Sequence, residues 1–140
     1  MAGSFKVTLD VEGRGPLFDG RADAALQDWA RATTKAIADE GVAMLRAVPM
    51  NKTGRARGNF QANLHVLQRG GNGTEAQIPA PMIRGVTWGP WLEGTSQRND
   101  STRFRGYHLF RQTRQALQKL APGIGQAELE KILPRIGGTP

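Results

Sequence analysis

The chain has 140 residues, which is enough for one domain, and it contains no cysteine, so neither disulfides nor thiolate–metal sites can hold the fold. No stretch reaches the roughly 18 apolar residues of a membrane span, and the alternating N-terminus lacks the pattern of a signal peptide, so we expect a soluble protein made inside the cell. The net charge is +7: residues 1–47 carry six basic and seven acidic side chains, and residues 48–140 carry thirteen and five. Such a local basic excess fits nucleic acid phosphate, an acidic protein or only solvent.

The first third of the chain predicts a strand and then a long helix. In Phe5–Val11 apolar and polar residues alternate, which is the period of a strand buried on one face. After a Gly/Pro turn, residues 22–48 place apolar side chains at three- and four-residue steps, as an amphipathic helix does. Asp23 near the start and Arg46 near the end suit the helix dipole, and Pro49 ends the helix.

The middle of the chain predicts strands and loops. Asn59–Gln68 alternates apolar and polar residues, and a Gly-rich turn separates it from Glu75–Ile78, its expected antiparallel hairpin partner. Ile83–Leu92 is apolar and aromatic but is interrupted by two glycines and a proline, which predicts an irregular strand or a short helical turn. Residues 95–106 form a polar, basic loop of the kind that orders against a partner.

Helical spacing returns in Tyr107–Leu120 and, after an Ala-Pro-Gly break, in Gln126–Ile136. We therefore expect an α+β fold with one long N-terminal helix, a small antiparallel sheet and one or two C-terminal helices. Residues 1–140 are expected to form a single domain. It would comprise an N-terminal strand or arm at 1–20, a core at 21–120, and a short C-terminal helix with a tail at 121–140.

Residues that carry catalytic or metal chemistry do not cluster in the sequence. His65 and His108 are far apart, and neither has a carboxylate close by in the chain. Only three acidic residues lie between Lys52 and Lys119, too few to suggest paired acid–base catalysis or a hard-metal site. Phosphate-binding glycine loops and nucleophile elbows are also missing. The sequence predicts that the protein is not an enzyme and uses no cofactor or metal.

Two segments are more specific than the rest. In the first, Ala47–Asn59 (AVPMNKTGRARGN), a Pro-broken helix leads into a Thr-Gly-Arg turn, where Gly54 can adopt positive φ and Arg55 projects outward. The second is Val86–Leu117, VTWGPWLEGTSQRNDSTRFRGYHLFRQTRQAL. It joins an aromatic-Gly-Pro-aromatic-x-Glu-Gly-Thr element to a basic loop, an aromatic-Gly-Tyr helix start and a helix.

This pair of segments resembles the family of siphophage minor tail-component proteins, also called tail-completion or head–tail joining proteins. The residues that match are Thr53, Gly54 and Arg55 in the turn; Trp88, Pro90, Trp91, Glu93, Gly94 and Thr95 in the second element; and Arg103, Phe104, Tyr107 and Phe110 before and within the last helix. The match covers about half of the chain. It departs from the family where Arg-Gly-Tyr replaces the common Arg-Pro-Phe, and the residues after Leu117 have no counterpart in it. The alternative interpretation of the aromatic residues, which does not use the resemblance, is that they form the core of a small domain.

The resemblance implies a structural virion protein of a tailed bacteriophage, made in the host cytoplasm, that forms a hexameric ring in the neck where the tail joins the head. A heterologous interface that closes under rotation gives such a ring. The expected partners are further copies of the chain and the neighbouring connector or stopper, tail-terminator and tail-tube proteins. Double-stranded DNA would pass through the lumen without specific binding, and no membrane is involved.

The residues expected at subunit or partner interfaces are Thr53, Gly54, Arg55, Trp91, Glu93, Gly94, Thr95, Arg98, Arg103 and Arg105. Glu93 lies between an aromatic cluster and the basic loop, so we expect it to form an ion pair with an arginine of its own or an adjacent subunit.

Two alternatives remain open at this stage. The same neck has other positions, so the chain could be the tail terminator or the head-closing stopper. A protein of another class, a basic nucleic-acid-binding module, fits the positive charge. Such a module should show a basic stripe, or aromatics alternating with Lys and Arg on a sheet, whereas the basic residues here lie mainly in turns and loops.

Overall fold

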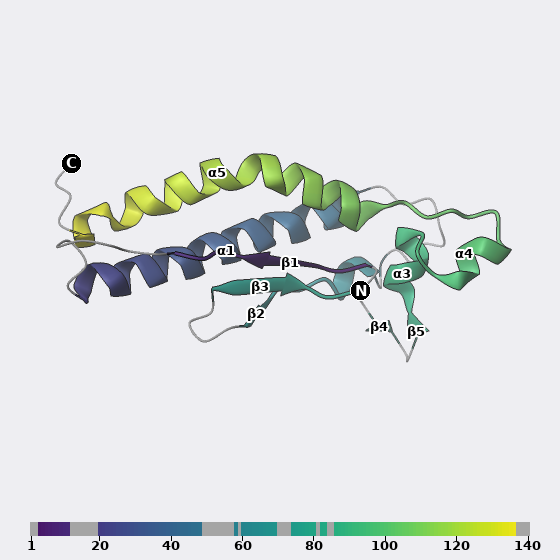
Figure 1. Cartoon of the computed structure of the whole chain (residues 1–140). Coiled ribbons are helices and arrows are strands. Elements are labelled where there is room, and N and C mark those ends of the chain that lie inside the picture. Colours follow the sequence, from purple (N-terminus) through teal and green to yellow (C-terminus); the bar gives the residue numbers. More distant parts are fainter. Residues whose placement is uncertain are drawn as a thin grey trace.

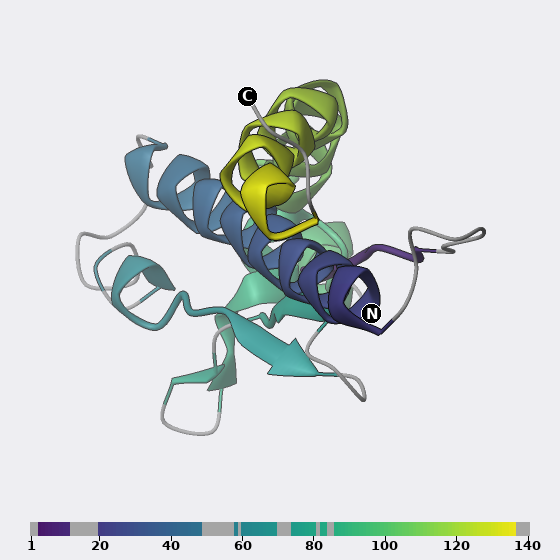
Figure 2. The same ribbon diagram turned by 90° about the vertical axis from the view of Figure 1, so that its left-hand side faces the viewer.

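The computed structural model describes residues 3–11, 20–48, 58, 60–69, 74–80, 82–83 and 86–136. Two long helices, α1 (Arg21–Ala47) and α5 (Leu109–Ile136), run in opposite directions, and a small sheet lies below α1 (Figure 1). The end-on view in Figure 2 shows α1 between the sheet and α5. The predicted α+β fold is therefore confirmed. Within the described residues, no helix combines the length and apolar character needed to cross a membrane.

The sheet has the strand order β1–β3–β2. Both β1 (Phe5–Thr8) and β2 (Leu67–Arg69) pair antiparallel with β3 (Glu75–Ile78), which confirms the predicted hairpin. In β1 the half-buried Phe5 and Val7 alternate with the exposed Lys6 and Thr8, as the sequence pattern predicts. Further along the chain, β4 (Met82–Ile83) and β5 (Val86–Thr87) form a second antiparallel ladder of two residue pairs.

The strand predicted for Asn59–Gln68 is wrong over most of its length. Residues 60–62 are helical, and β2 begins only at Leu67. Phe60 and Leu64, four positions apart, are both 1% exposed, whereas Ala62 between them is exposed. The same alternating sequence therefore also satisfies helical spacing, and burial of the two larger side chains selects the helical turn.

The end of α1 is tied to this turn by polar contacts. The Arg46 guanidinium donates to the backbone oxygens of Gln61 (3.3 Å) and Leu64 (2.6 Å), and the Gln61 amide donates to the Arg46 oxygen (2.6 Å). The bond from Gln61 satisfies a carbonyl in the last turn of α1, which has no partner inside the helix, and the two bonds from Arg46 fix the turn to the helix end.

The C-terminal segment forms one helix, not the two separated by an Ala-Pro-Gly break. α5 continues through Pro122 and Gly123, and Figure 1 shows it bowed. Proline removes one backbone donor from the helix, and packing on α1 compensates. The Trp29 indole donates to the Gly125 oxygen (2.8 Å), and Arg135 donates to Asp28 (2.8 Å), so the second half of α5 is held along the first half of α1.

The core lies where α1, the sheet and the first half of α5 meet. Its buried members are Ala38, Val42, Leu45, Phe60, Leu64, Ala76, Ile78, Leu92, Leu109 and Phe110. Gly41 lies in the second half of α1, at a position where a Cβ would be 2.9 Å from side-chain carbons of both Ile78 and Leu117. The glycine, a weak helix former, thus lets the sheet and α5 both approach α1 closely.

Two adjacent threonines of α1 give a matched test of this packing. The Thr33 hydroxyl is buried without a hydrogen-bond partner among the described residues, whereas the Thr34 hydroxyl donates to the Ala30 oxygen (3.0 Å). Removing a buried unsatisfied hydroxyl removes its desolvation cost. We predict that Thr33→Val raises the free energy of unfolding by about 1 kcal/mol, while Thr34→Val leaves it unchanged or lowers it by up to about 1 kcal/mol. Urea denaturation measures both, and an equal gain in the two variants would contradict the assignment.

Candidate interaction surface around Glu93

The aromatic-rich segment folds as a short helix with a glycine stop. α3 (Trp88–Glu93) has Pro90 in its first turn. Backbone N–H groups there have no partner inside the helix, so proline, which lacks an N–H, costs no hydrogen bond. The Gly94 and Thr95 amides both donate to the Pro90 oxygen, at 3.0 and 2.9 Å, and Gly94 has φ +101°. The positive φ of Gly94 and these two bonds form a glycine C-cap, so the Gly-Thr pair that follows Glu93 ends α3 and turns the chain.

Glu93 caps the start of α5. Its side chain is 6% exposed, and its two carboxylate oxygens accept hydrogen bonds from the backbone amides of Phe110 (2.8 Å) and Arg111 (3.1 Å). The first-turn amides of a helix have no partner inside the helix, and the helix dipole favours a negative charge there. Glu93 does not form the expected ion pair with any described residue, because both of its carboxylate oxygens are directed at the amides at the start of α5.

Two glycines allow the loop between α3 and α5 to close. Gly94 and Gly106 both have positive φ, +101° and +95°. A Cβ on Gly106 would overlap the Gly94 backbone, and a Cβ on Gly94 would overlap the Arg105 carbonyl. The adjoining backbone is bonded as well, since the Tyr107 and His108 amides donate to the oxygens of Leu92 (2.6 Å) and Glu93 (3.2 Å). The two chain segments therefore touch backbone to backbone.

The loop between them is organised by Asn99. It lies in α4 (Gln97–Ser101) and is 3% exposed. Its amide donates to the oxygens of Trp91 (2.9 Å) and Phe104 (3.1 Å), and its oxygen accepts from the Ser96 amide (3.0 Å). The sequence predicted a loop that orders only against a partner, but these bonds give it internal order within the subunit.

Three arginines are carried on this ordered loop. The Arg98 guanidinium carbon lies 5.3 Å from the centre of the Trp91 ring, a cation–π contact. The Arg105 guanidinium donates to the backbone oxygen of Asn99 at 3.1 Å, and Arg103 is exposed. Beneath them, the Phe104 ring packs against those of Trp91 (5.1 Å) and Tyr107 (5.0 Å). The loop is thus a supported basic surface at the α3–α4 end of the molecule, which we call the arginine surface (Arg98, Arg103 and Arg105; Figure 1).

The predicted interface residues have different places in the structure. Thr53, Gly54 and Arg55 lie outside the described residues. Glu93, Gly94 and Thr95 hold the loop together inside the subunit, whereas Arg98, Arg103 and Arg105 are exposed. The half-buried Trp91 supports the arginines from below.

Sequence reasoning missed Asn99, Gly106 and His108. Ser96 and Asn99 have the spacing of a capping box, with Asn in the position usually held by Glu or Gln, and this signal could have located α4. His108, just before α5, has a left-handed backbone conformation with φ +52°. Residues other than glycine rarely adopt this conformation, so the sequence carries no signal for it.

A pocket of about 440 Å³ adjoins Glu93 and has a basic lining that includes Lys6, His108, Arg111 and Arg114. In the described part of the chain, no three His, Cys, Asp or Glu side chains come together as a metal site would need. Both oxygens of Glu93 already accept backbone hydrogen bonds, and the cationic side chains of the lining suit an acidic group.

Comparisons with protein-family models, with curated proteins and with solved structures found no match to this chain.

The glycine contact yields a stability prediction with a control in the same chain. Gly106→Ala should lower the free energy of unfolding by about 3 kcal/mol or more, because the added carbon combines overlap with a left-handed backbone. Gly123→Ala, in α5 and with open space around it, should raise stability by about 0.5–1 kcal/mol. Thermal and urea unfolding report both, and a mild effect of Gly106→Ala would show that the loop closes differently.

The Glu93 cap yields a second stability prediction. Glu93→Gln keeps one acceptor but loses the charge, and should cost about 1–2 kcal/mol, while Glu93→Ala leaves two amides without partners and should cost about 3 kcal/mol. Glu130→Gln, on the exposed surface of α5, should stay within about 0.5 kcal/mol of the parent. Equal stability of the Glu93→Gln and Glu130→Gln variants would contradict the capping role.

Proposed function

We propose that the chain is a structural virion protein of a tailed bacteriophage that forms a ring in the neck and joins the tail to the head. The proposal starts from the resemblance of the Thr-Gly-Arg turn and of the Trp91–Tyr107 region to tail-completion proteins. The observation that carries it is the closure of this region. Glu93 and Gly94 from one part of the motif contact the start of α5 and Gly106 from the other, so the motif spacing serves one rigid unit that displays arginines.

The charge distribution supports a head-to-tail contact between copies. The arginine surface lies at one end of the molecule, while the start of α1 and the last turns of α5 lie at the other (Figure 1). Asp23 and Glu130 are exposed at that second end and form no ion pair with described residues. Exposed acidic side chains without an ion pair at one end and exposed arginines at the other favour a heterologous interface, which closes into a ring when the rotation fits. In line with the resemblance, we propose that the ring is a hexamer and that it acts by adhesion, without catalytic turnover.

The competing function is nucleic-acid binding, and one observation favours it. Arg103, Arg111, Arg114 and Lys119 are exposed and form no ion pair with described residues. A DNA-cellulose column at about 0.15 M salt separates the two functions, because a protein that neutralises several phosphates is retained there and released by more salt. A neck protein with DNA moving through its lumen should flow through.

Loss of the protein should block virion completion without blocking either half of the particle. Cells infected by a phage with a nonsense codon at Trp29 should accumulate DNA-filled heads and separate tails, visible by electron microscopy. Adding the purified protein to the lysate should restore infectious particles, because the missing step is stoichiometric association. Tails of uncontrolled length would indicate a terminator, and heads that leak DNA would indicate a stopper. Normal particles with a defect in lysis or replication would remove the neck assignment.

The same lysate tests the arginine surface with two variants of equal charge change. Arg103→Glu alters an exposed side chain of the surface, and Lys119→Glu alters an exposed side chain of α5. Both should unfold within about 0.5 kcal/mol of the parent. Only Arg103→Glu should lose most of the rescue, and equal rescue by both would contradict a role for this surface in assembly.

A further inference from the structure

β1 is an edge strand with a free side. It pairs with β3 alone among the described strands, so its other side presents unpaired backbone N–H and C=O groups. Leu9, Asp10 and Val11 follow β1 in the chain, beyond Thr8↔Glu75, the last residue pair of the β1–β3 ladder. Val11 is 38% exposed and is one of few large apolar side chains at the described surface.

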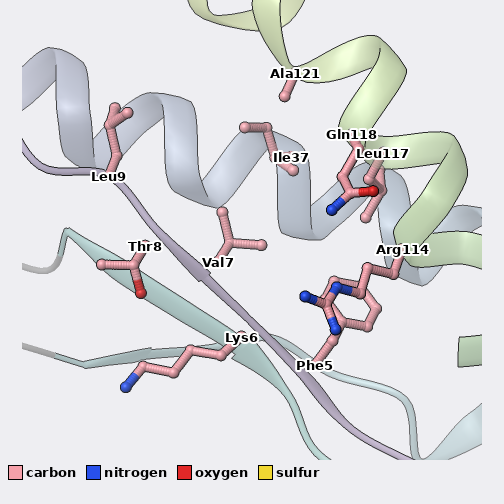
Figure 3. Close-up of a pocket in the computed structure, with 10 residues that line it drawn as sticks. All are labelled: Phe5, Lys6, Val7, Thr8, Leu9, Ile37, Arg114, Leu117, Gln118 and Ala121. Atoms are coloured by element: carbon pink, nitrogen blue, oxygen red, sulfur yellow. The ribbon is translucent and has the colours of Figure 1, made fainter. Parts of the chain in front are cut away.

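An apolar groove runs along this free side. It encloses about 270 Å³ between β1 and the first half of α5, and its apolar lining comprises Phe5, Val7, Leu9, Ile37, Leu117 and Ala121 (Figure 3). An open edge beside an apolar groove is the arrangement that accepts an added strand, through backbone bonds and side-chain burial together. The opposite edge of the sheet, β2, offers less, because Gln68 and Arg69 are exposed there.

The sequence of the edge shows which strand fits. Around Thr8, the segment Phe5–Val11 (FKVTLDV) has the same pattern in both directions: Val7 mirrors Leu9, Lys6 mirrors Asp10, and Phe5 mirrors Val11. In an antiparallel pair of identical strands centred on Thr8, each residue therefore meets a residue of matching type. Apolar residues face the groove side, and each Lys6 faces an acid on the other side.

We propose that two copies of the free protein pair antiparallel through their β1 edges, centred on Thr8, to give a two-fold dimer with a continuous six-stranded sheet. Lys6 then lies opposite Asp10 of the partner subunit twice in the interface. Within its own chain Lys6 already contacts Glu75 (3.0 Å), while Asp10 forms no ion pair with a described residue, so the pairing gives Asp10 a counter-charge. Val11 of the partner subunit covers Phe5 at the end of the groove.

Both the apolar lining and the charge pattern favour a second copy over nucleic acid as the occupant. Six of the ten residues that line the groove are apolar, and two, Lys6 and Arg114, are charged. A backbone strand satisfies the open edge, which a phosphate chain does not. The pairing stands apart from the proposed ring, because it concerns the free protein and uses a different surface.

A cysteine on the two-fold axis tests the register directly. The chain has no cysteine, so Thr8→Cys introduces a single thiol. Directly opposed residues of antiparallel strands have Cα atoms about 4.5–5.5 Å apart, which is within the range of a disulfide. Mild oxidation of Thr8→Cys should give nearly complete covalent dimer on a non-reducing gel, and Ser101→Cys, exposed on α4, should give little. Equal cross-linking of the two variants would overturn the proposal.

A charge swap tests the pairing without relying on one variant. Sedimentation equilibrium should show a monomer–dimer equilibrium for the parent. Asp10→Lys places like charges opposite each other twice and should weaken dimerisation about tenfold or more. The double variant Lys6→Asp with Asp10→Lys reverses both charges and should restore it to within about threefold. A monomer at every concentration, an oligomer indifferent to these charges, or no recovery in a folded double variant would each overturn the proposal.

Discussion

Two backbone amides at the start of α5, those of Phe110 and Arg111, bond to the carboxylate of Glu93, which lies seventeen and eighteen positions earlier in the chain. This contact does more than cap a helix. It fixes α3 to α5, and with the Gly94–Gly106 contact it closes the intervening residues into a loop of set shape. The aromatic stack, the Asn99 network and the position of the exposed arginines all follow from that closure. A buried carboxylate with both oxygens bonded to backbone is costly to disturb, since removing it leaves unpaired amides.

The closure also explains why the surface is suited to assembly. Arginine side chains lose conformational freedom when they bind a partner, and a rigid support lowers the remaining cost. Arg98 is held against the Trp91 ring and Arg105 against the Asn99 oxygen, so both are partly ordered before any partner arrives. Arg103 is exposed on the same loop. The arginine surface and the β1 edge belong to different elements, so one subunit has two separate surfaces for contacts with other chains.

The sequence predicted the elements in which the spacing of apolar residues fits either a helix or a strand, but not both. α1 and β1 fall within a residue or a few of their expected ranges, because residues 22–48 fit only helical spacing and Phe5–Thr8 fits only alternation. Where a pattern fitted both periods, as at Phe60 and Leu64, long-range burial decided, and that information is not local. Pro122 predicted a break that packing of Trp29 on Gly125 overrides.

The sequence located the residues of this region but not their contacts within the subunit. The motif includes Glu93, Gly94 and the basic loop, yet within its own chain the Glu93 carboxylate bonds to two backbone amides and forms no ion pair with a described residue, which depends on the helix end that the carboxylate meets in space. Gly106 and Asn99 act through positive φ and through buried amide bonds, and neither can be assigned until the two loop ends are known to touch.

The most direct measurement of the central interaction is amide hydrogen exchange at the first turn of α5. Amides at the start of a helix normally exchange fast, since they have no partner within it. The amide of Asp23, in the first turn of α1, is an internal reference, because Gly20 supplies no side-chain cap there. If Glu93 holds α5, the amides of Phe110 and Arg111 exchange slowly, as helix-interior amides do, while that of Asp23 exchanges fast. Fast exchange at Phe110 and Arg111, equal to that at Asp23, would contradict the capping of α5 by Glu93.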